Sequence, residues 1–155
     1  MDLIRLILRP ILAAAWLCAG LGATAAEPSA DQAAIRHVLM STFDKPEARL
    51  AVDPVVVVGK HAIAGWAQGE RGGRALLMRH GTEWQITLCA GDGLKHAQML
   101  REAGISKADA DALARDLASA EAKLPAAQRA RFATFDGVVR MDANGQHPPA
   151  HKHKE

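Results

Sequence analysis

The side chains of this sequence best suited to chemistry are histidines, and three of them gather near the C-terminus. His147, His151 and His153 place three imidazole rings within seven residues. Imidazole nitrogen is a good ligand for copper, zinc and nickel, and short histidine-rich tracts are a compositional sign of metal binding. The tract therefore predicts a metal site, although a tail that is merely soluble would share its composition.

Methionines close to histidines give a second indication of metal binding. The thioether is a soft ligand that selects copper(I), and it survives where a free thiolate would oxidise. Met78 and His80 are two residues apart in an expected strand, so their side chains point to the same face. Ordinary packing is the alternative for this pair, because methionine commonly fills gaps in a core. We predict copper as the bound metal, with six ligands: Met78, His80, Met141, His147, His151 and His153.

Two other histidine and methionine pairs occur on expected helices. His37 lies opposite the apolar face of its helix, three residues before Met40, so this exposed pair could share a metal ion. His96 lies three residues before Met99, on the apolar side of its helix, where we expect a packed histidine. Neither pair enters the predicted ligand set.

Cys89 is the only cysteine that follows the N-terminal segment, because Cys18 lies inside the apolar run described next. An internal disulfide is then impossible, which excludes a disulfide-stapled secreted scaffold. Three interpretations of Cys89 stay open: a buried small hydrophobe, a partner in an intermolecular disulfide, or a metal ligand. Burial is the ordinary explanation and the one we favour.

The first 26 residues are typical of a cleavable signal peptide. Arg5 and Arg9 precede an apolar run from Ile11 to Leu21, and Ala23-Thr24-Ala25 offers a small-x-small cleavage site. The run is too short for a permanent membrane helix, and no later segment is apolar enough to cross a bilayer. We therefore expect a periplasmic protein with no membrane span after signal cleavage.

Composition and motifs exclude several functions. The 19 lysines and arginines nearly balance the 17 aspartates and glutamates and form no basic stripe, which argues against nucleic acid as a partner. The sequence contains no G-x-S-x-G or H-E-x-x-H motif, and no glycine-rich phosphate-binding loop follows a strand and opens a helix. We therefore expect a protein that is not an enzyme.

The pattern of apolar residues predicts a single α+β domain over residues 27–142, followed by a disordered histidine-containing tail over 143–155. A capping box at Ser29–Gln32 opens an N-terminal helix. Two to three C-terminal helices lie between Leu94 and Arg131, and we expect the helices to pack on one face of a curved sheet. That sheet is an antiparallel β-meander of four strands: Val55–Val58, His61–Ala67, Arg74–His80 and Glu83–Cys89.

Two details of the predicted meander bear on the site. Gly69–Gly73 is expected to be a flexible loop between two strands. In the last strand, apolar side chains alternate with more polar ones, so one face should be core and the other wetter. The wetter face would carry Gln85, Thr87 and Cys89.

Three segments carry a resemblance to a known family. They are AIRHVLMSTFDKPEARLAVDPVVV (34–57), AGWAQGERGGRALLMRHGTEWQITLCAGDGLK (64–95) and the terminal HPPAHKH. The chain resembles the copper uptake system-associated proteins over most of its length after the signal peptide. The resemblance implies a periplasmic accessory of copper uptake, with a copper chaperone or an outer-membrane copper transporter as its partner. It carries over no catalytic or metal-binding residue.

Two other functions compete with copper binding. A metal-independent protein-binding module would dock a copper transporter or chaperone through the wetter sheet face or an exposed strand edge. A small-molecule binder or enzyme would use the hollow of the curved sheet. We rank the second of these last, because five aromatic residues after the signal peptide are few for a large aromatic-lined pocket.

Overall fold

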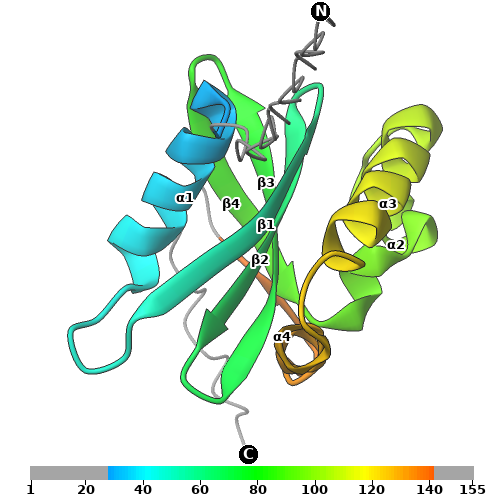
Figure 1. The fold of residues 1–155 in the computed structure, drawn as a ribbon. Helices are drawn as coiled ribbons and strands as arrows, with labels where there is room; N and C mark the ends of the chain where they lie inside the picture. Colours follow the sequence, from blue (N-terminus) through cyan, green and yellow to red (C-terminus); the bar gives the residue numbers. More distant parts are fainter. Residues whose placement is uncertain (1–27, 142–155) are drawn as a thin grey trace, which may run out of the picture.

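A five-stranded antiparallel sheet forms the centre of the fold (Figure 1). The computed structural model describes residues 28–141, so the predicted signal peptide and histidine tail lie outside the described residues. The strands follow one another in chain order across the sheet. They are β1 (Leu50–Val58), β2 (His61–Gln68), β3 (Arg71–His80), β4 (Glu83–Ala90) and β5 (Val138–Arg140).

Two-residue turns connect the first four strands. Each turn begins with a glycine in the left-handed region: Gly59 at φ 57°, Gly69 at 60° and Gly81 at 61°. Hairpin turns of this length need that backbone conformation because it matches the twist of the paired strands, and glycine adopts it without steric cost. The predicted α+β class and meander are therefore confirmed, and β5 is added to them.

The helices cover both faces of the sheet, as Figure 1 shows. Helix α1 (Ala30–Phe43) packs Ile35 and Leu39 against one face. On the other face, α3 (Lys107–Glu121) contributes Leu113 and Leu117 to a second core. The remaining helical elements are η1 (Asp92–Lys95), α2 (Ala97–Glu102) and α4 (Ala126–Phe132).

The expectation of helices on a single face is therefore wrong. The physical reason lies in β2, where all residues from His61 to Gly65 are buried. A strand covered on both faces shows a continuous apolar run instead of alternation. Because small and apolar residues follow one another in this strand, its sequence shows no alternation of polar and apolar side chains. Such an alternation would have indicated whether one face or both faces are covered.

A bulge at Thr87 changes which face the end of β4 presents. Leu76 pairs with Leu88, whereas the next residue of β3, Leu77, pairs with Ile86. Thr87 is therefore an extra residue of β4 with no partner in β3. Beyond it, each side chain of β4 points to the face opposite to the one that regular alternation would give. Cys89 consequently packs in the core under α1, and Leu88 packs on the α3 side. The predicted wetter face of Gln85, Thr87 and Cys89 does not exist as one surface.

Strand β3 begins earlier than predicted. Gly72 and Gly73 belong to this strand and are buried, so the expected flexible loop is reduced to the turn at Gly69 and Glu70. Glycines inside a strand often mark a place where another part of the chain approaches closely.

Within residues 28–141, none of the helices has the length and apolar character that crossing a bilayer requires.

Candidate functional site

An apolar cavity of about 180 Å³ lies on the α1 face of the sheet. Gln68 is the polar residue of its wall, and its Nε2 already donates to the carbonyl oxygens of Phe43 at 2.9 Å and Ala48 at 2.6 Å. Trp66 and Phe135 meet edge to face in the wall, with ring centroids 5.7 Å apart. The lining residues are Phe43, Leu50, Trp66, Gln68, Cys89, Phe135 and Met141.

Two sulfur side chains line this cavity, and the sheet explains how they come together. Cys89 pairs with Val139 of β5, so both residues point to the α1 face. Met141 lies two residues beyond Val139 and donates its backbone N–H to the Thr87 carbonyl oxygen at 3.0 Å. Continued strand geometry therefore turns Met141 to the same face as Cys89. A soft thiol and a soft thioether thus share one apolar wall.

Burial controls the chemistry of the Cys89 thiol. Its side chain is buried, as predicted, and burial raises the pKa of the Cys89 thiol to about 11. The thiol is therefore protonated at neutral pH, which makes it a poor nucleophile. A soft monovalent metal ion that displaces the proton would leave the net charge of the site unchanged.

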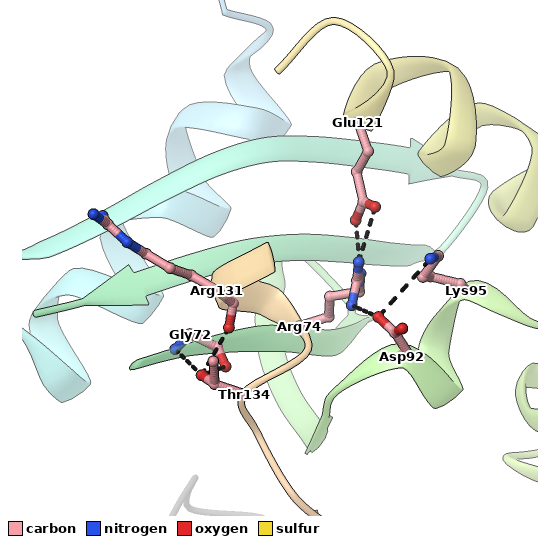
Figure 2. A network of polar contacts seen from close by, with 7 residues as sticks. All are labelled: Gly72, Arg74, Asp92, Lys95, Glu121, Arg131 and Thr134. Atoms are coloured by element: carbon pink, nitrogen blue, oxygen red, sulfur yellow. Dashed lines mark hydrogen bonds and ion pairs between the residues drawn. The ribbon is translucent and has the colours of Figure 1, made fainter. Parts of the chain in front are cut away.

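Close backbone contacts hold Phe135 over the cavity. A Cβ on Gly73 would lie 2.9 Å from the Cβ of Phe135, and a Cβ on Gly91 would collide with the Phe135 carbonyl oxygen. Thr134 ties the same segment to β3, because its Oγ1 accepts the backbone N–H of Gly72 at 3.0 Å (Figure 2). Glycines at these positions therefore allow the segment to close one side of the cavity.

Replacing Gly91 by alanine is expected to lower the free energy of unfolding by about 1 to 3 kcal/mol, because the added methyl group displaces Phe135. Urea unfolding measures the change. Gly93→Ala is the matched control, since a Cβ there meets only the flexible end of the Met99 side chain. Equal stability of the two variants would contradict the close packing of Phe135 on Gly91.

A buried ion-pair network lies beside this segment (Figure 2). Arg74 is 1% exposed and donates from Nε and Nη2 to the two carboxylate oxygens of Glu121, at 2.6 and 2.8 Å. Its Nη1 donates to Asp92 at 3.1 Å, and the guanidinium lies 5.2 Å from the centre of the Phe132 ring. The network joins β3, η1, α3 and α4, and each of the three guanidinium nitrogens of Arg74 donates to a carboxylate. We therefore assign it to stability.

The structure separates the predicted ligands that it describes. Met78 is half-buried and lines a cavity on the α3 side of the sheet, whereas Met141 lines the cavity on the α1 side. His80 is exposed at the end of β3. The three histidines predicted in the tail, His147, His151 and His153, lie outside the described residues. Among residues 28–141, no three or more histidine, cysteine, aspartate or glutamate side chains gather in a way that could hold a metal ion.

The two other histidine and methionine pairs have different outcomes. His37 is exposed and Met40 is 40% exposed, as the helical pattern predicted. His96 is exposed, so the expectation of a packed histidine is wrong. The reason is that α2 begins at Ala97, and His96 lies before the helix with an extended backbone.

Sequence reasoning did not place Trp66, Phe135 and Cys89 in one site. The three residues come from β2, from the segment before β5, and from β4 beyond its bulge. The glycine pairs around them were the available signal, since glycine in a strand marks close approach.

Comparisons with known proteins add no relative to this picture. No family model matches the chain, and neither a curated protein nor a solved structure does so. The described residues therefore define the class of protein by themselves. It is an α+β protein with a five-stranded antiparallel meander, helices on both faces and a sulfur-lined apolar cavity.

Proposed function

We propose that this protein is a non-enzymatic accessory of copper uptake that binds copper(I) in the periplasm. The observation that carries the proposal is the shared position of Cys89 and Met141 in one apolar cavity. Thiolate and thioether are the protein ligands that favour copper(I) among the biological metals. The resemblance to copper uptake system-associated proteins supports the same function from the sequence.

The composition of the cavity wall favours a soft monovalent ion over harder ones. Calcium and magnesium require several oxygen ligands, and among the described residues that line the cavity Gln68 alone has a side-chain oxygen. Structural zinc sites take four nitrogen or sulfur ligands, which this wall does not supply. Copper(I) is satisfied by fewer ligands, and the surrounding aromatic rings would keep water and oxidants away from it.

The predicted histidine tail has a separate role in this proposal. His147, His151 and His153 follow Met141 in the chain and would collect copper from a chaperone or an outer-membrane transporter. Ligand exchange would then pass copper(I) from imidazole to sulfur with no change of oxidation state. Met78 and His80 remain predicted ligands outside the sulfur cavity.

A copper(I) titration against a competing chelator tests the proposal. The chain from residue 27 onward is compared with Met141→Leu and with a triple variant in which His147, His151 and His153 are alanine. We expect Met141→Leu to lower the affinity for copper(I) by about ten-fold or more. The triple variant should retain the affinity of the cavity lined by Cys89 and Met141. Copper(I) binding that disappears only in the triple variant would exclude the cavity. Absence of binding in all three proteins would favour the metal-independent docking module.

A further inference from the structure

A buried histidine on the opposite face of the sheet lacks a hydrogen-bond partner. His61 begins β2, its side chain is only 8% exposed, and its Nδ1 accepts or donates no hydrogen bond. Burial lowers the pKa of His61. The Asp109 carboxylate opposes this effect by raising the pKa, and the positive charge of Lys60 lowers it further. The imidazole is therefore neutral at neutral pH and has a free nitrogen lone pair, the form that binds metals. Buried polar atoms are ordinarily paired, so this one requires an explanation.

The distance between His61 and Asp109 suits two ligands of one ion. Asp109 Oδ2 lies 3.8 Å from His61 Nδ1, which is too far for a hydrogen bond. Two ligand atoms bound to one tetrahedral ion at about 2.1 Å lie about 3.4 Å from each other. A small adjustment of the Asp109 side chain, which is 39% exposed, would give that distance. The Ser106 cap fixes the backbone there, because Ser106 Oγ accepts the Asp109 N–H at 3.2 Å.

Met78 adds a sulfur atom to the same place. It pairs directly with His61 across β2 and β3, so the two side chains project side by side from one face. Both line a cavity of about 210 Å³, which also includes Ile105 and Thr87. The His61 imidazole therefore has the Met78 side chain beside it on the sheet and the Asp109 carboxylate of α3 at 3.8 Å.

We propose that His61 Nδ1, Asp109 and Met78 form a second metal site, which takes a divalent transition-metal ion. The mixed nitrogen, oxygen and sulfur ligands suit copper(II), which the Irving–Williams order places above zinc and nickel. Lys60 and Arg140 also line this cavity, and their positive charges oppose a divalent cation. The site is therefore of moderate affinity, with a Kd in the micromolar range. It does not depend on the sulfur cavity on the other face.

Paramagnetic copper(II) provides a direct test with methionine-methyl NMR. The sample is the chain from residue 27 onward, with its tail histidines replaced by alanine so that they cannot compete. Copper(II) broadens signals from nearby nuclei only. Added without a reductant, it should first broaden the Met78 methyl signal. The Met40 signal from α1, which packs on the opposite face of the sheet, should persist.

Asp109→Asn and Asp116→Asn are matched variants for this test, since both change a partly exposed carboxylate of α3. Asp109→Asn should raise the Kd for copper(II) by about ten-fold or more, and Asp116→Asn should leave it unchanged. His61→Gln should abolish the selective broadening of Met78. Uniform broadening of the methionine signals, or equal affinity in the two aspartate variants, would overturn the site. Neither result would affect copper(I) binding by Met141.

Discussion

Replacing Glu121 by glutamine is expected to lower the free energy of unfolding by about 3 kcal/mol. Glu121 accepts two hydrogen bonds from Arg74, and both side chains are almost completely buried. Removal of one charge from a buried pair leaves the other charge uncompensated, which typically costs 3 to 5 kcal/mol. Asp92 still contacts the guanidinium at 3.1 Å, and this contact places the expected cost at the lower end.

Two comparisons separate charge from packing in this experiment. Asp116→Asn breaks the exposed pair of Arg115 and Asp116 and should cost less than about 1 kcal/mol. The double variant Arg74→Met with Glu121→Leu removes both buried charges and should be closer to the parent in stability than Glu121→Gln alone. Urea unfolding measures all three. If Glu121→Gln is no less stable than Asp116→Asn, the network of Arg74, Glu121 and Asp92 does not contribute to stability in the way that we assigned to it.

Replacing Cys89 by serine is expected to weaken copper(I) binding by about 100-fold or more, equivalent to about 2.7 kcal/mol. A hydroxyl group is a hard ligand with almost no affinity for copper(I), and Met141 would be left as the single soft ligand of the cavity. The change of one atom keeps the volume of the wall nearly constant, so unfolding curves should verify that the fold persists. Competition with a copper(I) chelator measures the affinity.

The pH dependence of this affinity gives an independent check. The pKa of the Cys89 thiol is about 11, so copper(I) must displace a proton at any pH between 7 and 9. Binding should therefore strengthen by about ten-fold for each unit of pH in that interval, since deprotonation becomes less costly as the pH rises. Cys89→Ser should lack this dependence. A pH-independent affinity in the parent protein would indicate that the thiol is not a ligand.

Local sequence signals predicted much of the secondary structure. The capping box at Ser29 is present, with Ser29 Oγ accepting the Gln32 N–H at 3.2 Å and Gln32 Oε1 accepting the Ser29 N–H at 3.0 Å. Ser106 caps α3, and two-residue turns that begin with glycine connect the first four strands. These features depend on residues close together in the sequence, and that explains why their pattern is visible without a structure.

Features that depend on pairing between distant segments could not be predicted. Whether Cys89 faces α1 depends on one extra residue at Thr87, because a bulge inverts the alternation beyond it. Strand β5 has only three residues, too few for a periodic pattern, yet its pairing brings Met141 to the cavity. The proximity of His61 to Asp109 could not be predicted, because Asp109 comes from a helix 48 positions later in the chain.

The two cavities place two sets of candidate ligands on opposite faces of the sheet, which the sequence pattern did not predict. The sulfur atoms of Cys89 and Met141 lie on the α1 face, whereas His61, Met78 and Asp109 lie on the α3 face. Soft ligands favour copper(I) and mixed ligands favour a divalent ion. An accessory that meets copper in both oxidation states could use the two faces separately.

The most direct test of copper(I) binding in the sulfur cavity is methionine-methyl NMR of the chain from residue 27 onward, titrated with copper(I) under reducing conditions. Met40, Met78 and Met141 report from three separate places in the structure. We predict that the Met141 methyl signal shifts in proportion to the first equivalent of copper(I), while the Met40 and Met78 signals stay in place. Full binding of copper(I) with an unchanged Met141 signal would contradict the proposed site.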